Sequence, residues 1–228
     1  MYCRGTKRRG QIVEEYNVVP KVHIKLLAGQ EKISDAGGII EKEYYIFEAT
    51  PKEGGNPEII LCGLSATKDF LRRLNHNGLP VFNPLRGEGG NAGGDPQGGE
   101  ETEGYGNGNP QRGDGDGGEG NLEWNPIARQ LYNACMWVII IIDAKAGTPI
   151  FKIQEKVYSL RDREPFDSRV KGVNTIIMKN LQGRTLTEAI NELRANNRIR
   201  DELCQFNLLE GIINNARDNA GNPIQSYF

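Results

Sequence analysis

The chain has 228 residues with 28 basic and 30 acidic side chains, a formal net charge of −2, and is long enough for one large or two small domains. Its four cysteines lie far apart and form no Cys-x-x-Cys pair, which excludes a disulfide framework and favours a reduced, cytoplasmic setting. No apolar segment follows the basic N-terminus, so we expect no signal peptide. The apolar run at 138–142 is too short to cross a bilayer, so we expect no membrane association.

The least ordinary stretch is 87–121, which holds fifteen of the 29 glycines, eight acids and one base. Too few apolar side chains are present to offset the entropy of ordering it, so we predict a disordered, acidic, glycine-rich linker. The remaining chain then forms a basic mobile arm at 1–10, a β-rich block at 11–86 and a helical block at 122–228. Outside the linker the charge is +5, a balance that suits weak binding of a polyanion. The alternative, which the charge alone favours, is an ordinary soluble protein with a solvated linker.

The β-rich block has the pattern of a small antiparallel sheet with one helix. Strand character runs through 11–27, 41–50 and 58–62, and we expect 44–49 and 58–62 to form a hairpin. The clearest alternation assigns three residues to the core (Val22, Ile24 and Leu26) and three to solvent (Lys21, His23 and Lys25). After Gly63 the apolar spacing becomes helical, with Ser65 as the predicted N-cap of a helix that continues to about residue 75.

The second block is predicted to be entirely helical. Asn125 followed by Pro126 is a helix-start signal, and the apolar spacing after it favours a helix of about sixteen residues. The alternative is that the β-branched run at 137–142 forms a buried strand. Thr185 and Glu188 form a capping box before a further helix. Additional helices are predicted at 149–161, 168–178 and 206–216, so the fold class is α+β.

Basic side chains gather in three places that suit contact with nucleic-acid phosphates. They are the arm (Arg4, Arg8 and Arg9), the first helix (Lys68, Arg72 and Arg73) and the region that follows the capping box (Arg194, Arg198 and Arg200). Nearby acids, such as Asp69 and Asp201, leave an ordinary solvated helix face as the alternative for the two helical groups. The arm contains no acid, and its alternative is a frayed, solvated terminus. The aromatic rings of Tyr44, Tyr45 and Phe47 would stack on bases if they face outward.

A second interpretation rests on the Asp-Ala-Lys sequence at 143–145, directly after the isoleucine run. It resembles the way a large class of metal-dependent nucleases presents its site. The resemblance implies that Asp143 holds Mg²⁺ and that Lys145 orients or activates the attacking water. Such a site needs another acid, for which Glu123 and Glu48 are the candidates. If the preceding segment is a helix, the two charged residues are instead its polar end.

A third interpretation concerns metal binding or covalent catalysis in the first block. Four residues there have the ligand types of a tetrahedral zinc site: Cys3, His23, Cys62 and His76. Ala66 stands where a second cysteine of a zinc-binding turn would fall, and without that ligand Cys62 is a small buried apolar residue. Cys62 or Ser65 with His76 is also a candidate nucleophile and base, although the second glycine of a nucleophile elbow is missing.

We therefore predict a non-enzymatic accessory or adaptor protein without a cofactor, which contacts nucleic acid or a nucleoprotein assembly and has a protein partner. The first alternative is the metal-dependent nuclease, which requires a divalent ion. The second is a protein-interaction module that docks through an apolar strip at 79–85 or 224–228 and ignores nucleic acid.

Overall fold

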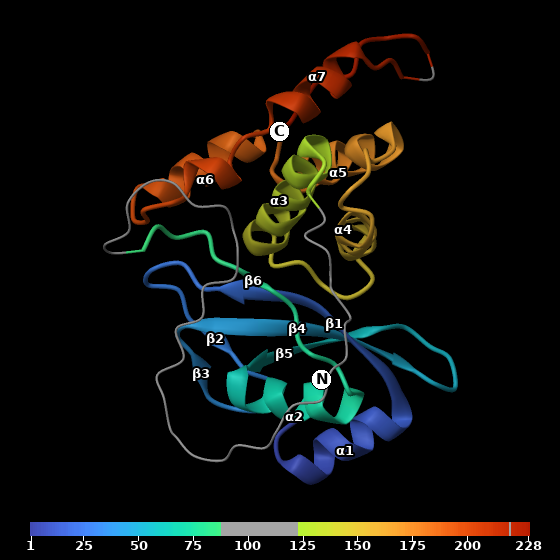
Figure 1. The fold of residues 1–228 in the computed structure, drawn as a ribbon, viewed down its shortest axis with the longest axis vertical. Helices are drawn as coiled ribbons and strands as arrows, with labels where there is room; N and C mark the ends of the chain where they lie inside the picture. The colour runs from blue at the N-terminus through green and yellow to red at the C-terminus, as the bar shows by residue number, and fades with distance from the viewer. Residues whose placement is uncertain (88–122, 219) are drawn as a thin grey trace, which may run out of the picture.

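The computed structural model describes residues 1–87, 123–218 and 220–228. A four-stranded sheet of order β5-β4-β1-β6 lies between two layers of helices (Figure 1). The first half contains α1 (Thr6–Glu15), β1 (Tyr16–Lys25), β2 (Lys32–Ile33), β3 (Ile39–Ile40), β4 (Glu43–Pro51), β5 (Glu58–Gly63), α2 (Leu64–Leu74) and β6 (Val81–Phe82). The second half contains α3 (Pro126–Ile141), α4 (Pro149–Ser159), α5 (Asp167–Asn180), α6 (Leu186–Arg194), the 3₁₀ helix η1 (Asp201–Leu203) and α7 (Asn207–Asn215).

The predicted α+β class and the helical second half are confirmed. The predicted hairpin is also confirmed, because β4 pairs antiparallel with β5. The sheet is mixed rather than antiparallel, since β1 pairs antiparallel with β4 but parallel with β6. Apart from Gly87, the predicted linker lies outside the described residues. Within the described part of the chain, no helix is both long and apolar enough to span a bilayer.

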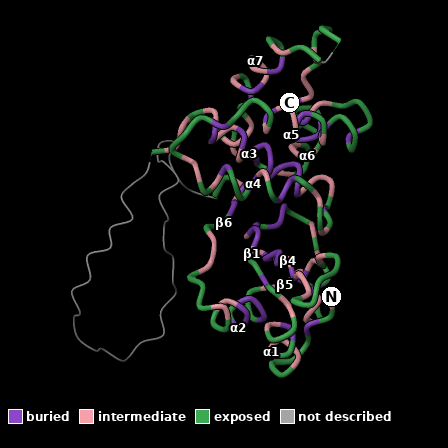
Figure 2. Tube along the Cα trace, turned by 90° about the vertical axis from the view of Figure 1, so that its right-hand side faces the viewer, coloured by how far each residue is buried: buried purple, intermediate pink, exposed green. Residues whose placement is uncertain are grey.

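The sheet is buried on both faces. Helices α1 and α2 cover one face, and the helices of the second half cover the other (Figures 1 and 2). In β4 the side chains of Tyr44 and Ile46 join the core on the side of the second half, whereas Tyr45 and Phe47 join the core under α1 and α2. All four residues are buried. The three aromatic rings are therefore core residues, and none is free to stack on a base.

Strand β1 changes faces partway along its length. A register shift between Pro20 and Val22 inserts one residue opposite β4, as a β-bulge does. The predicted core residues Val22, Ile24 and Leu26 are confirmed, with 2%, 1% and 4% of their surface exposed. Their core is shared with the helical second half.

The expectation that Lys21 and His23 face solvent is wrong, because helices cover both sides of β1. The ammonium of Lys21 is buried and lies 2.8 Å from a carboxylate oxygen of Glu155 on α4. The ring of His23 stacks on Tyr45 with centroids 4.1 Å apart, and its Nε2 lies 3.0 Å from the Glu43 carboxylate. Only Lys25 of the three predicted surface residues is exposed.

Residues 1–10 are not the predicted mobile arm, and 11–15 are not strand, because α1 occupies Thr6–Glu15. Cys3 and Ile12 are fully buried beneath this segment. The helix has few apolar residues and an internal glycine, Gly10, so its intrinsic helix propensity is weak. Packing against α2 and the sheet supplies the stability that the local sequence lacks.

Helix α3 settles the alternative at 137–142 in favour of a sixteen-residue helix. The Asn125 side chain caps it by accepting from the amides of Ile127 and Ala128 at 3.0 and 3.2 Å. The predicted helices at 149–161, 168–178 and 206–216 correspond to α4, α5 and α7. The capping box is confirmed at α6, where Thr185 and Glu188 exchange hydrogen bonds of 3.1 and 2.8 Å.

The two halves share one hydrophobic core. The ring of Phe82 on β6 meets Trp137 of α3 edge to face, with centroids 5.9 Å apart. Phe228 is buried in the same core and packs near Phe206. The strips 79–85 and 224–228, predicted as docking surfaces, therefore place their phenylalanines in the interior of the protein itself.

Candidate nucleic-acid interface

Two of the predicted basic groups, separated by about 60 residues of chain, meet in one layer. Helix α1 carries Arg8 and Arg9, and α2 carries Lys68, Arg72 and Arg73; the two helices pack side by side under the sheet (Figure 1). Residues 4–15 and 64–74 together contain seven bases and three acids. This layer, which we call the α1–α2 basic surface, therefore has a charge of +4.

A single carboxylate organises three of these arginines. Asp69 accepts hydrogen bonds from Arg9 Nε at 2.6 Å, Arg72 Nη2 at 2.5 Å and Arg73 Nε at 3.2 Å. Only 9% of Asp69 is exposed, whereas 73% of the Arg72 side chain is exposed. The carboxylate therefore lies at the buried end of its ion pairs, and Arg72 presents its charge to solvent, whereas the side chains of Arg9 and Arg73 are 12% and 28% exposed.

The ionisation of Asp69 follows from the same contacts. Burial by itself raises the pKa of the carboxyl group, but the hydrogen bond from Arg9 and the charge of Arg73 outweigh burial, with Arg72 adding to them. The pKa consequently lies below its ordinary value, and Asp69 is charged at neutral pH. A charged acid surrounded by three bases leaves an excess of two positive charges at this point.

Further contacts hold the guanidinium groups in place while leaving donors for a ligand. Arg9 donates from Nη1 to the Cys3 carbonyl at 3.2 Å, and Arg73 donates from Nη2 to the Thr6 carbonyl at 3.1 Å. The Arg73 side chain crosses α1 at Gly10, where a Cβ atom would come within 3.1 Å of Nη1. Within the described residues the hydrogen bond of Arg72 is made through Nη2, and 73% of its side chain is exposed, which leaves Nε and Nη1 as donors for a ligand. Such groups suit phosphate oxygens.

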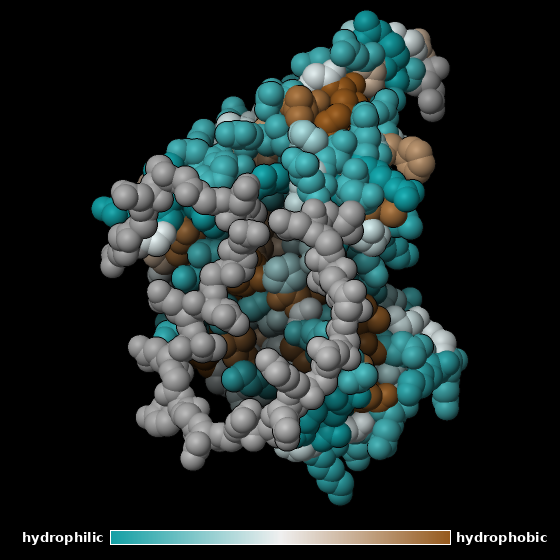
Figure 3. All heavy atoms as spheres, viewed as in Figure 1, coloured by the Kyte–Doolittle hydropathy of each residue, from teal (hydrophilic) through white to brown (hydrophobic). Residues whose placement is uncertain are grey.

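Other basic members of this surface make no contact with Asp69. Arg4 and Lys68 are exposed, and Arg8 lies 3.6 Å from the carboxylate of Glu15 at the far end of α1. Figure 3 shows hydrophilic side chains over the α1 end of the molecule, whereas apolar ones gather at the opposite end beside α7.

The third predicted basic group lies elsewhere and is matched by acids. Arg194 Nη1 lies 2.7 Å from Asp201, which also pairs with Arg86, and Arg200 Nε lies 3.0 Å from Glu202. The hydrogen bond from Arg194 lowers the pKa of Asp201 below its ordinary value. Residues 186–203 contain three bases and four acids, so this cluster, the α6–η1 cluster, carries no positive excess.

The structure separates one of the proposed nuclease residues, Glu123, from the other two. Glu123 lies just before α3 and Asp143 just after it, and sixteen residues of helix separate the two by about 24 Å. Asp143 instead pairs with Lys32 at 2.5 Å, and Glu48 lies 3.4 Å from Lys21. Asp143 and Lys145 line a pocket of about 360 Å³ between β5 and the turn after α3.

The proposed zinc ligands come together only in part. The sulfur atoms of Cys3 and Cys62 lie 3.7 Å apart. His23 is held by Glu43, and His76 accepts a hydrogen bond from the Gly78 amide at 2.8 Å. The described residues contain no group of three or more histidine, cysteine or acidic side chains arranged to hold a metal ion.

The candidate nucleophile–base pair is also separated. Ser65 lies in the first turn of α2 and His76 lies beyond its last turn, so the length of the helix stands between them. The expected N-cap role of Ser65 falls to Gly63, because the helix begins at Leu64. Cys62 is fully buried beside Cys3, which keeps it from a substrate.

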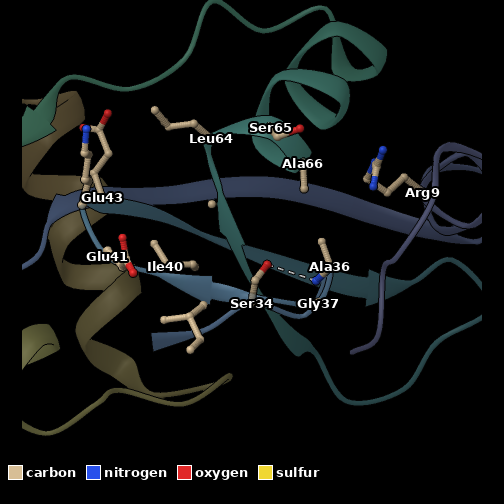
Figure 4. A pocket seen from close by; sticks show the side chains of 13 residues that line it. Arg9, Ser34, Ala36, Gly37, Ile40, Glu41, Glu43, Leu64, Ser65 and Ala66 are labelled. Carbon is tan, nitrogen blue, oxygen red and sulfur yellow. Dashed lines mark hydrogen bonds between the residues drawn. The ribbon is translucent and has the colours of Figure 1, made fainter. Parts of the chain in front are cut away.

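A larger pocket of about 480 Å³ lies at the start of α2 (Figure 4). Arg9 stands at one end of it, and Glu41 and Glu43 stand at the other. Ser34 points into the pocket but its hydroxyl accepts from the Ala36 amide at 3.1 Å. The pocket therefore has charges of both signs and continues the basic surface only at its Arg9 end.

Asp69 is the residue of this site whose role the sequence analysis missed. Its neighbours at i+3 and i+4 are arginines, and this helical spacing was the available signal. The third arginine, Arg9, comes from a segment about 60 residues away, and no local pattern connects the two.

Fold and site together define an α+β protein in which two basic helices cover one face of a mixed sheet. Residues 2–227 match the model of the family described as "Uncharacterised conserved protein UCP028583", and the chain belongs to that family. No curated protein and no solved structure matches the chain.

Proposed function

We propose that this protein is a non-enzymatic accessory protein that binds nucleic-acid phosphates through the α1–α2 basic surface. The observation that carries the proposal is the buried Asp69 carboxylate, which accepts hydrogen bonds from three arginines. Residues 4–15 and 64–74 together contain seven bases and three acids, so the surface around this carboxylate is positively charged. Fixed guanidinium groups lose little entropy when they bind a phosphate, and each contact releases counterions from the nucleic acid.

Binding of this kind is independent of sequence. Phosphate contacts fix position on the nucleic acid but do not read bases, and the nearby aromatic rings of Tyr45 and Phe47 are buried. We therefore expect moderate affinity, steep dependence on salt and little preference among sequences. A protein partner would then supply any selectivity for a particular target.

The nuclease alternative has less support. Asp143 pairs with Lys32, and the first candidate for its partner acid, Glu123, lies at the opposite end of α3. The second candidate, Glu48, pairs with Lys21 at 3.4 Å. The interaction-module alternative also has less support, because the phenylalanines of both proposed strips are buried in the core.

The deciding experiment is fluorescence anisotropy of labelled single- and double-stranded oligonucleotides, titrated with wild type and two double variants. Lys68→Glu/Arg72→Glu reverses two exposed charges on the basic surface, and we expect affinity to fall by roughly tenfold or more. The matched control, Lys179→Glu/Arg198→Glu, makes the same change in net charge on exposed residues of the second half and should stay within about twofold of wild type.

Each other outcome has a definite meaning. Equal loss in both variants would show that net charge alone attracts the oligonucleotide, which contradicts a specific surface. A flat titration of wild type at low salt would exclude nucleic-acid binding and favour the interaction module. A signal that decays with time only in the presence of Mg²⁺, and is lost in Asp143→Ala, would favour the nuclease.

A further inference from the structure

Two buried thiols face each other beneath α1. Cys3 lies in the segment before α1, Cys62 lies at the end of β5, and their sulfur atoms are 3.7 Å apart. Neither residue has any exposed surface. A disulfide needs the two sulfur atoms at about 2.05 Å, so they must approach by less than 2 Å.

The backbones that carry the two thiols are held in place by one loop residue. The carbonyl of Asp35 accepts from the Cys3 amide at 2.8 Å, and its carboxylate accepts from the amide of Leu61, next to Cys62, at 2.7 Å. Both cysteines are therefore positioned relative to the same residue. The remaining approach is a matter of side-chain rotation and small local shifts rather than rearrangement of the sheet.

The two thiols are chemically unequal. The hydrogen bond from Cys62 lowers the pKa of Cys3, with burial opposing it and the charge of Arg9 assisting. The same hydrogen bond, together with burial, raises the pKa of Cys62. The positive charge of Arg9, whose Nη1 donates to the Cys3 carbonyl at 3.2 Å, favours the thiolate form of Cys3, and a thiolate is the form that attacks a disulfide.

The other two cysteines provide an internal comparison. Cys135 is fully buried in α3, and Cys204 follows η1, where its thiol lies 3.4 Å from the Arg200 carbonyl. All four cysteines belong to the described residues, and among them only the thiols of Cys3 and Cys62 contact each other.

We propose that Cys3 and Cys62 form a reversible disulfide that fastens the segment before α1 to β5. The oxidant is a small-molecule disulfide such as oxidised glutathione. The Cys3 thiolate attacks one glutathione sulfur, forming a mixed disulfide and releasing one glutathione thiolate. The Cys62 thiolate then attacks Cys3 Sγ and releases the second. Two protein thiols are oxidised, one glutathione disulfide is reduced to two thiols, and these take up the two protons.

Entry of the oxidant requires local opening of residues 1–5. This segment has no helix or strand of its own, so it can open without unfolding the sheet. The disulfide would join residues that lie 59 apart in the sequence. A cross-link over a loop of that length lowers the conformational entropy of the unfolded chain and so stabilises the folded state. The oxidised protein should therefore melt at a temperature on the order of 10 °C higher than the reduced protein.

The test is incubation of the folded protein in glutathione buffers of increasing oxidising strength, followed by acid quenching and intact mass, then by alkylation in denaturant and peptide mapping, because the thiols are buried in the folded protein. We expect a species lighter by two hydrogen atoms, a linked pair of peptides containing Cys3 and Cys62, and alkylation of Cys135 and Cys204. Circular dichroism monitors that the fold is retained. Cys204→Ala should behave as wild type, whereas Cys62→Ala should lose both the mass change and the rise in melting temperature.

Two results would overturn the proposal, and both are read on wild type, so they do not depend on the folding of a variant. One is full alkylation of Cys3 and Cys62 after the most oxidising buffer. The other is a linked peptide that forms only when denaturant is present, because that outcome would show that the folded geometry does not permit the bond. Neither result bears on nucleic-acid binding.

Discussion

The α1–α2 basic surface and the α6–η1 cluster look alike in sequence, since each places arginines beside acids, but they differ in where the acid lies. Asp69 is 9% exposed and one of its three arginines, Arg72, has a side chain that is 73% exposed, whereas Asp201 is itself exposed and pairs with Arg86 and Arg194. A buried acid leaves the charge of an exposed arginine such as Arg72 at the surface. An exposed acid occupies the surface itself and cancels that charge.

The largest difference between the two regions should be in stability. Asp69→Ala leaves Arg9 and Arg73 without their shared partner in a partly buried site, and we expect a loss of about 3 kcal/mol in the free energy of unfolding. Asp201→Ala, in the exposed cluster, should leave the denaturation midpoint unchanged. Chemical denaturation of the two variants and wild type measures both effects. Equal midpoints in the two variants would mean that burial of the acid has no energetic role.

The pH dependence of stability sharpens the same comparison. Because the pKa of Asp69 is lowered in the folded state, its contribution is complete above the ordinary carboxyl pKa of about 3.9 and is lost as pH falls through the lower folded value. Wild type should therefore lose more stability than Asp69→Asn between neutral and strongly acidic pH. In moderate salt, Asp201→Asn should follow the wild-type profile, since screening weakens its exposed ion pairs. Unfolding free energies measured at a series of pH values provide the check.

The smallest difference should appear in the salt dependence of oligonucleotide binding. Lys68→Gln/Arg72→Gln removes two phosphate contacts, so the slope of log affinity against log salt should decrease in magnitude by about 2. Lys179→Gln/Arg198→Gln should leave the slope at its wild-type value. Anisotropy titrations over a range of salt concentrations give both slopes, and a change in the second pair alone would place the interface on the helical half.

The helical half was predictable because its signals are local. The Asn125-Pro126 start, the Thr185–Glu188 capping box and the apolar spacing of α4 each depend on residues within two turns of one another. The β-branched run in α3 is the exception, because the intrinsic preference of isoleucine is for strand. Its packing in the hydrophobic core outweighs that preference, and the run is helical.

The first half was predicted less well because its structure depends on contacts distant in the sequence. Helix α1 is held by α2, and Lys21 finds Glu155 more than a hundred residues away. One local signal was available in the sequence of β4. Four consecutive apolar residues at 44–47 are typical of a strand that is buried on both faces, whereas apolar and polar residues alternate in a strand with one solvent-exposed face. That pattern indicated a second layer of helices.

The candidate site shows the same division. The basic residues could be found individually from the sequence, and Asp69 with Arg72 and Arg73 could have been grouped by helical spacing. The contact of Asp69 with Arg9, and the contact between Cys3 and Cys62, each join segments about 60 residues apart in the sequence. These contacts could be found only from the three-dimensional structure.

The double covering of the sheet has a consequence during synthesis on the ribosome. The face formed by Val22, Ile24, Tyr44, Ile46 and Phe82 is complete once β6 has emerged, but its cover begins with α3. At 5–20 residues per second, the 44 residues between Phe82 and Pro126 take roughly 2 to 9 seconds to translate. Throughout that interval the nascent chain presents an apolar sheet face to the cell, which is the kind of surface that chaperones bind.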